Sequence, residues 1–236
     1  MIEVKNAYKS YGVTRALRSV SFSVPTGQFT VLVGPNGSGK TTLLKVLAGL
    51  TRPERGSVAI CGMSIRDEST QVRRRTGVVL HQNMLYGELT ARGNLSFYAQ
   101  MYGLRNPAER IHQIVAQMGM LAHIDQRVSS LSHGMAKRIS IARALLHDPD
   151  VLLLDEPETG LDEEGVEILK NIVLAKKDAG SRKTVLMSTH NISQWLEVSD
   201  SVVVMAAGRV VHEGPSGMLS AASLRKAYQE LVEVER

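Results

Sequence analysis

The chain has 236 residues, a formal charge of +5, 43% hydrophobic residues and a single cysteine. This length supports one large domain, or a core with an inserted lobe, and the apolar fraction excludes a disordered chain. The lone Cys61 cannot form an internal disulfide, so a disulfide-stapled secreted scaffold is excluded and a reducing compartment is predicted. The apolar runs are far shorter than the roughly 20 residues of a membrane helix, so we expect a cytoplasmic chain without a membrane span.

Charge is distributed unevenly along the chain. Residues 1–118 carry 15 Lys and Arg against 6 Asp and Glu, whereas residues 119–236 carry 13 against 17. A basic half can face nucleic acid or a membrane surface. A run such as Arg73–Arg75 is more often a solvated face, and we interpret it in that way.

Short runs rich in Val, Leu and Ile recur along the chain, and several are apolar throughout, which is typical of strands buried on both faces of a parallel sheet. The predicted strands are Val4–Tyr8, Val20–Val24, Phe29–Val33, Ser57–Ile60, Gly77–Leu80, Val151–Leu154, Thr184–Ser188, Val202–Met205 and Val210–His212. Residues 83–148 lack this pattern and are predicted to be helical, and a short helix is expected around Leu224. The chain is therefore predicted to be a single α/β unit with a core of residues 1–82 and 149–236 and a helical insertion at 83–148.

A phosphate-binding loop is predicted directly after the strand Phe29–Val33. The residues from Gly34 to Thr41 fit the P-loop pattern G-x-x-x-x-G-K-S/T at every defined position, and an apolar helical pattern follows. Glycines allow the backbone N–H groups to converge on phosphate oxygens, Lys40 supplies positive charge to the β- and γ-phosphates, and the Thr41 hydroxyl can ligate Mg²⁺. The candidate phosphate-binding residues are Gly34, Pro35, Asn36, Gly37, Ser38, Gly39, Lys40, Thr41 and Thr42.

Two adjacent carboxylates follow the apolar strand Val151–Leu154, at the strand end where α/β folds place ligands. Asp155 is predicted to hold the metal ion, directly or through water. Glu156 is predicted to orient the attacking water or to accept its proton. Two acids before Pro157 would by themselves indicate only a turn, but the P-loop upstream favours the catalytic interpretation.

The P-loop and the acid pair, together with five further motifs in a fixed order, resemble the nucleotide-binding subunit of an ABC transporter over nearly the whole chain. Tyr11 matches the aromatic residue that stacks on adenine, and Gln82 matches the Q-loop. Residues 131–135 (Leu-Ser-His-Gly-Met) occupy the place of the LSGGQ signature. Asp162, in Gly-Leu-Asp, matches the D-loop, and His190, after Ser-Thr, matches the switch histidine.

The resemblance implies a P-loop NTPase core with a mostly parallel sheet, an N-terminal antiparallel β subdomain and a helical subdomain inserted after the Q-loop. It implies a Mg²⁺-dependent ATPase, and the residues it assigns to catalysis are Glu156, His190 and Gln82, with Thr41, Gln82 and Asp155 as metal ligands. Ser132, Gly134 and Asp162 would contact ATP at the interface of a head-to-tail homodimer or heterodimer.

The resemblance also implies a membrane partner. The region of the Gln82 loop would contact an integral membrane transporter subunit, which would place this chain peripherally on the cytoplasmic side of the cell membrane. No nucleic-acid partner is expected. The signature departs from the consensus at His133 and Met135, but Ser132 and the backbone N–H donors are retained, so we expect ATP to be sandwiched as in the family. Two interpretations of these departures remain open. Either they slow the closure of the dimer over ATP, or they are a feature of the subfamily without consequence.

The subfamily is predicted from the segments 81–90, 94–98, 102–104, 141–149 and 211–214. They resemble the ATP-binding subunit of haem exporters of cytochrome c maturation, and nearly as well ABC-2 type lipid, polysaccharide or drug exporters. We predict the haem-exporter type. Two other classes remain open: a soluble ABC-type ATPase acting on nucleic acid, suggested by the basic half, and an almost inactive heterodimer partner, suggested by the altered signature.

Overall fold

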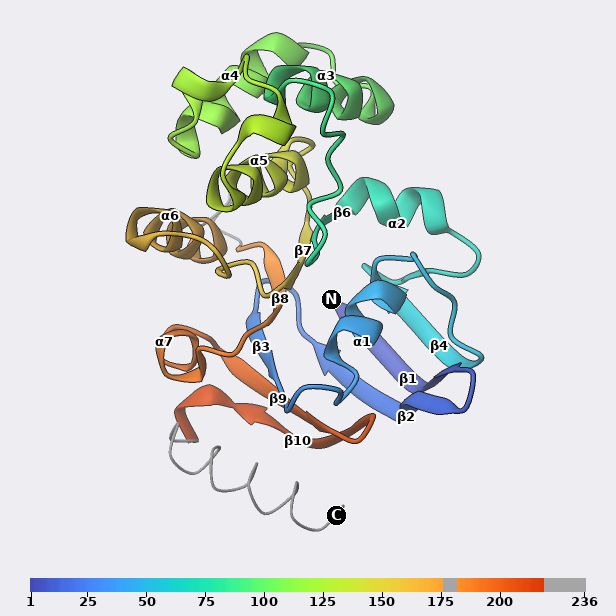
Figure 1. Cartoon of the computed structure of the whole chain (residues 1–236). Coiled ribbons are helices and arrows are strands. Elements are labelled where there is room, and N and C mark those ends of the chain that lie inside the picture. Colours follow the sequence, from blue (N-terminus) through green and yellow to red (C-terminus); the bar gives the residue numbers. More distant parts are fainter. Residues whose placement is uncertain (176–181, 219–236) are drawn as a thin grey trace.

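The computed structural model describes residues 1–175 and 182–218 (Figure 1). The helix predicted around Leu224 lies outside these residues. In the described part, no helix is long and apolar enough to cross a membrane.

The first of two sheets is antiparallel, with the strand order β2-β1-β4-β5. Its strands are β1 (Ile2–Tyr11), β2 (Thr14–Val24), β4 (Arg55–Ile60) and β5 (Met63–Ser64). In β1, Ile2 and Val4 are buried while Glu3 and Lys5 are not, which is the alternation expected of a sheet with one covered face. This sheet is the predicted N-terminal antiparallel subdomain.

The second sheet has the order β10-β9-β3-β8-β7-β6, and all its pairs are parallel except β9 with β10. Its strands are β3 (Phe29–Val33), β6 (Thr76–Val79), β7 (Val151–Asp155), β8 (Thr184–Ser188), β9 (Ser201–Ala206) and β10 (Arg209–Pro215). β3, β7 and β8 are buried at every residue because apolar layers cover both faces. Their carboxyl ends share one edge, where Asp155 pairs in register with Ser188.

The helices fall into two groups (Figure 1). Those in the core are α1 (Lys40–Leu47), α2 (Ser69–Arg75), α6 (Glu163–Leu174) and α7 (Ile192–Leu196). The helical insertion, drawn in green to yellow-green at the top of the figure, contains α3 (Ala91–Tyr102), α4 (Pro107–Gln117) and α5 (His133–Leu145). Short 3₁₀ turns form at Leu121–His123, Val128–Ser130 and Ser216–Met218. The predicted α/β fold class is confirmed.

Helix α2 was not predicted. Its sequence Ser-Thr-Gln-Val-Arg-Arg-Arg has one buried residue, Val72, so it carries no apolar stripe that would indicate a helix. Arg73–Arg75 form the last turn, where positive charge interacts favourably with the helix dipole.

Within the helical insertion, a partly buried aromatic stack joins α3 to the segment that follows α5. The imidazole of His147 lies flat on the ring of Tyr102 from α3, with ring centroids 3.8 Å apart and 9° between the planes. The pKa of His147 is lowered to about 4, chiefly by burial and also by the charges of Arg143 and Lys183; the Thr76 backbone and the charge of Asp148 oppose this shift.

The free energy of unfolding should therefore fall at acidic pH. The unfolded chain binds a proton at His147 near pH 6.5, whereas the folded chain does so only near pH 4. As the pH falls from 6.5 to 4, protonation of His147 in the unfolded chain should lower the free energy of unfolding by up to about 3 kcal/mol, measured by urea unfolding. His147→Phe keeps the stack without the proton and should flatten this dependence. The same pH slope in both chains would contradict the assignment.

Candidate functional site

The P-loop connects the end of β3 to the start of α1, and two of its glycines are required by close approach of other backbone. A Cβ atom at Gly34 would lie 2.4 Å from the carbonyl oxygen of Met205. A Cβ atom at Gly39 would lie 2.5 Å from the carbonyl oxygen of Ala16, and Gly39 also has a φ of +103°. The loop is therefore held between β2 and β9 in a conformation that requires glycine at both positions.

The ammonium group of Lys40 lies inside this loop. The residue is only 6% exposed, and its Nζ donates hydrogen bonds to the carbonyl oxygens of Gly34 (2.6 Å) and Pro35 (3.1 Å). Burial lowers the pKa of Lys40, while the charges of Glu156 and Asp155 raise it. The loop thus presents a positive charge beside the two acids.

Asp155 has the contacts expected of a metal ligand. It is 2% exposed, and its Oδ1 accepts hydrogen bonds from the hydroxyls of Ser188 (2.7 Å) and Thr41 (3.3 Å). Its Oδ2 is buried and has no hydrogen-bond partner among the described residues. An unsatisfied carboxylate oxygen next to a hydroxyl group fits Mg²⁺, which prefers hard oxygen ligands.

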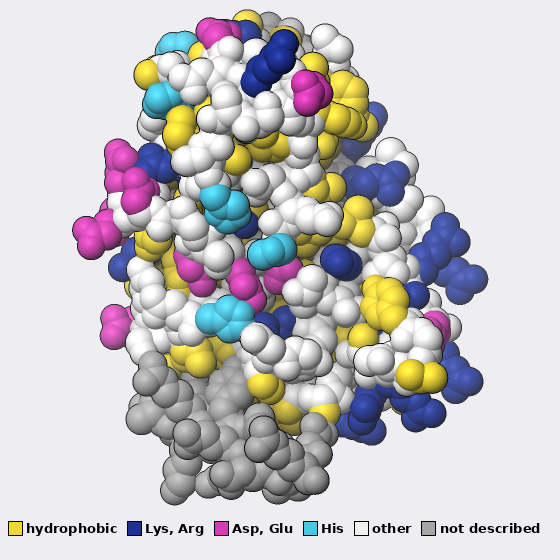
Figure 2. Space-filling model, in the orientation of Figure 1, with side chains coloured by type: hydrophobic (Ala, Val, Ile, Leu, Met, Phe, Trp, Pro, Cys, Tyr) yellow, Lys and Arg dark blue, Asp and Glu magenta, His cyan; other side chains and the backbone are white. Residues whose placement is uncertain are grey.

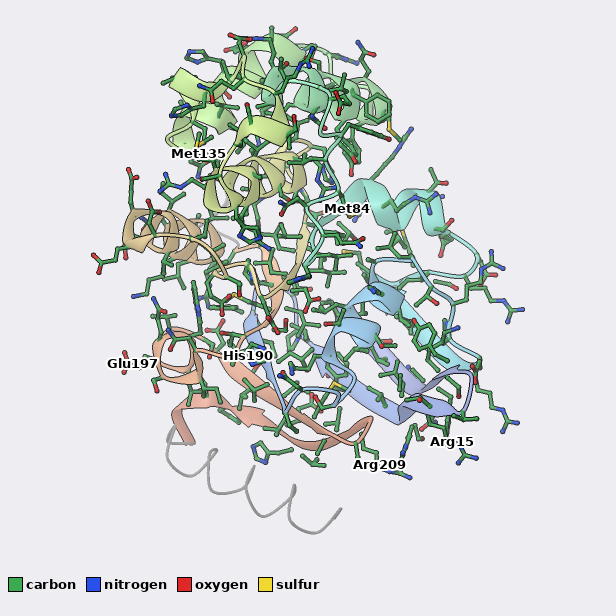
Figure 3. All side chains as sticks on the ribbon, viewed as in Figure 1. Arg15, Met84, Met135, His190, Glu197 and Arg209 are labelled. Atoms are coloured by element: carbon green, nitrogen blue, oxygen red, sulfur yellow. The ribbon has the colours of Figure 1, made fainter. Side chains whose placement is uncertain are left out.

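Glu156 and His190 are brought together from two strands. Nε2 of His190 lies 2.5 Å from Oε1 of Glu156, and the backbone N–H of Glu156 donates to both the hydroxyl and the carbonyl oxygen of Ser188, each at 3.1 Å. Figure 3 labels His190 close to the centre of the molecule. A carboxylate in contact with an imidazole is an arrangement suited to accepting and positioning a proton of water.

The signature segment begins helix α5. Ser132 is the N-cap, and its Oγ accepts a hydrogen bond from the backbone N–H of Met135 at 3.2 Å. A Cβ atom at Gly134 would lie 2.5 Å from the carbonyl oxygen of Gly160, so the signature packs directly against the D-loop. Figure 2 shows this face of the molecule, with Asp and Glu side chains gathered near its centre and His side chains around them.

Asp162 of the D-loop caps α6 by accepting from the backbone N–H of Gly165 at 2.9 Å. It also forms an ion pair with Arg138 of α5 at 2.5 Å, and this hydrogen bond lowers the pKa of Asp162. Glu164 accepts from the same Arg138 at 3.0 Å. The D-loop is therefore tied to the signature helix by a charged pair that the sequence analysis did not predict.

Two predicted site residues lie outside this network. Tyr11 is 50% exposed at the end of β1, and the ammonium of Lys9 lies 5.3 Å from its ring centroid. Gln82 is exposed in the segment after β6. Among the described residues, the polar contacts of Lys40, Asp155, Glu156 and His190 involve neither of these side chains. The arrangement thus assembles the P-loop, the two acids and the histidine, and leaves Tyr11 and Gln82 apart.

Four residues near these groups were not predicted from the sequence: Ser188, Thr189, Glu158 and Lys137. Ser188 and Thr189 precede His190, and they served only to identify the motif. The signal that could have found them is the parallel register, because a polar residue at the end of β8 must lie beside Asp155 at the end of β7. Nothing in the sequence places Lys137 of α5 near these acids.

Comparison with known proteins decides the family. A family model described as ABC transporter matches residues 17–159, which is more than half of the chain. The chain belongs to the ABC transporter family. It is 35% identical over 205 residues to the ABC transporter ATP-binding protein NatA of Bacillus subtilis, covering 86% of this chain and 82% of that protein.

Other relatives agree with this assignment. The Nod factor export ATP-binding protein I of Burkholderia orbicola is 37% identical over 217 residues, covering 90% of this chain and 70% of the relative. A solved structure described as the ATP-binding subunit of an ABC transporter has a TM-score of 0.86 and 29% identity, covering 98% of this chain and 99% of that one. The dimeric ATP-binding cassette MJ0796 bound to ADP and Pi has a TM-score of 0.81 and 27% identity, covering 92% and 99%. The prediction that this chain is the ATP-binding subunit of an ABC transporter is thus confirmed.

Lys40→Ala tests the phosphate site of this ABC protein. Charge-assisted hydrogen bonds contribute about 1.5–3 kcal/mol, so we expect ATP to bind about 10-fold to 100-fold more weakly, measured by isothermal titration calorimetry. Lys45→Ala is the matched control, since Lys45 is exposed on the same helix. Equal affinity of Lys40→Ala and the wild type would remove Lys40 from the phosphate site.

Proposed function

We propose that this chain is the Mg²⁺-dependent, ATP-hydrolysing subunit of an ABC exporter. The observation that supports this most directly is the contact of Glu156 with His190 at 2.5 Å, at the sheet edge that also carries Asp155. Relatives described as Nod factor export ATP-binding proteins support an export role.

The proposed chemistry assigns one task to each group. Lys40 and the backbone N–H groups of the loop residues 34–42, except Pro35, bind the phosphates. Thr41 and Asp155 would hold Mg²⁺, together with Gln82 if its segment closes on the nucleotide. The metal ion would neutralise charge on the β- and γ-phosphates. Glu156 accepts a proton from the attacking water, and His190 holds the carboxylate and faces the γ-phosphate.

We propose a head-to-tail dimer in which Ser132, Gly134 and Asp162 of one chain close over ATP bound to the P-loop of the other. In this arrangement, Tyr11 stacks on the adenine. Two observations support it. The N-terminus of the thirteen-residue α5 is exposed at Ser132 and His133, and related solved structures are described as dimeric cassettes.

A groove next to the Gln82 segment supports the proposal of a membrane partner. This groove, of about 350 Å³, lies between α2, the α3 helix and the end of α1. It is lined by Ala48, Leu50, Thr70, Val72, Arg73, Arg74, Thr76, Val78, Met84, Tyr98, Met101, Tyr102, Arg143 and Ala144. Met101 is 66% exposed, and Figure 3 labels Met84 between α2 and the helical insertion. We propose that residues 83–148 form the unit that transmits motion from this groove to the signature.

The groove also indicates the chemistry of that partner. Arg143 forms no ion pair with any described residue; its guanidinium lies over the Tyr98 ring at 5.2 Å and donates to the carbonyl oxygen of Val78 at 2.5 Å. Its Nε is buried without a hydrogen-bond partner in the described part. A buried cation without a carboxylate favours a partner segment that is apolar and carries an acidic residue.

The sequence segments given above lead us to propose that the transported substrate is haem, for cytochrome c maturation. The relatives described above do not include a haem exporter, and the Nod factor export proteins among them favour the alternative of another exporter. The membrane protein that co-purifies with the chain would decide between the two.

Glu156→Gln tests the ATPase. The amide keeps the shape and the hydrogen bond to His190 but cannot accept a proton, so we expect kcat to fall by about 10²-fold to 10⁴-fold, measured as phosphate release. ATP affinity should stay unchanged because the P-loop is intact. A wild-type chain that releases no phosphate from ATP would contradict the proposed function, and an unaffected Glu156→Gln chain would contradict the role of Glu156.

Met101→Asp tests the membrane partner. A carboxylate in the centre of an apolar contact costs about 1–3 kcal/mol or more, so we expect at least a tenfold loss of the integral membrane protein that co-purifies from detergent-solubilised membranes of the native host. Glu109→Ala, on the exposed face of α4, is the matched control. Phosphate release by the isolated chain should be unaltered. Undiminished recovery of the membrane protein would place the contact elsewhere.

A further inference from the structure

Glu158 is an acidic residue to which the proposed chemistry assigns no role. It follows β7 in the turn after Glu156 and is partly buried. Its Oε1 accepts a hydrogen bond from the hydroxyl of Thr189, the residue before His190. Its Oε2 is buried and has no partner among the described residues. A buried carboxyl that makes one side-chain hydrogen bond at the edge of a catalytic site requires an explanation.

The hydroxyl of Thr189 links Glu158 to the backbone on the far side of His190. Thr189 is buried, and its Oγ1 accepts a hydrogen bond from the backbone N–H of Asn191 at 2.9 Å. A hydroxyl has a single proton, and giving it to Glu158 leaves the lone pairs of Oγ1 to accept from Asn191. The chain from Glu158 through Thr189 to Asn191 therefore fixes the backbone on both sides of His190.

A buried cation from the signature helix faces the same group of acids. Lys137 of α5 is 1% exposed, and its Nζ lies 3.4 Å from the carbonyl oxygen of Leu80. Burial lowers the pKa of Lys137, and the charges of Asp155, Glu158 and Glu156 oppose this shift. Burial also raises the pKa of Glu158. The ammonium is thus a counter-charge for carboxyl groups that would otherwise be costly to bury.

We propose that Glu158 is a positioning residue that holds His190 against Glu156 through the hydroxyl of Thr189. The proposal rests on the proposed function, since it assigns a task to His190 in ATP hydrolysis.

Three substitutions separate this role from a general loss of stability. Glu158→Ala removes the acceptor, Thr189→Val removes the hydroxyl at equal size, and Glu158→Gln retains a carbonyl oxygen that can accept the bond. Because a displaced catalytic group lowers the rate and not the binding of substrate, we expect the first two to lower kcat by about 10-fold to 100-fold with KM for ATP unchanged. Glu158→Gln should stay within about threefold of the wild type.

A double-mutant cycle tests whether Glu158 acts through His190. In a His190→Ala chain, Glu158→Ala should lower the remaining rate by less than about twofold, because the group that it positions is gone. If the rate loss of the double mutant equals the product of the losses of the two single mutants, the proposal is overturned. Glu167→Ala, which removes an exposed acid of α6, is the matched control and should leave the rate unchanged.

A measurement without ATP keeps this proposal distinct from the proposed function. The imidazole resonance of His190, assigned by comparison with His190→Gln, reports its contact with Glu156 by ¹H–¹³C NMR. In Glu158→Ala and Thr189→Val, we expect this resonance to move towards its position in Glu156→Ala, and in Glu158→Gln to stay in place. An unmoved resonance in both would overturn the positioning role, whether or not the chain hydrolyses ATP.

Discussion

The hydroxyl of Ser188 is the contact on which the site depends. It donates to Asp155 at 2.7 Å and accepts from the backbone N–H of Glu156 at 3.1 Å, so one side chain at the end of β8 orients both acids at the end of β7. The parallel register makes this possible, because it places Asp155 and Ser188 opposite each other. With β3 on the other side of β8, the P-loop begins at the same edge. The strand order therefore creates the site before any ligand binds.

Charge compensation is the second constraint. Asp155 ends β7, and Glu156 and Glu158 follow it; carboxylates so close together are stable only with cations or protons beside them. Two helices supply cations, Lys40 from α1 and Lys137 from α5, and the imidazole of His190 contacts Glu156. Since α5 belongs to the helical insertion, the charge balance of the site depends on the position of that insertion. A partner that moves the insertion by binding at the groove would therefore change the electrostatic environment of the acids.

Most of the fold could be predicted from the sequence because its signals are local. β3 and β8 have the predicted bounds, whereas β2 begins six residues before its predicted start and β5 was not predicted. The remaining strands differ by one to three residues at their ends. Helix α2 escaped prediction because it buries only Val72. The candidate P-loop and the acid pair were readable because each is a short continuous motif with a fixed spacing.

The sequence by itself determined the family, the order of the motifs and the residue types at each candidate position. Only the tertiary structure decided which of these residues meet: Glu156 with His190, Asp162 with Arg138, and Glu158 with Thr189, pairs between 24 and 34 residues apart. Such contacts depend on strand order and on helix packing, which no local pattern encodes. The formal charge of +5 shows the same limit, because it says nothing of an edge where the cations Lys40 and Lys137 lie near three acids.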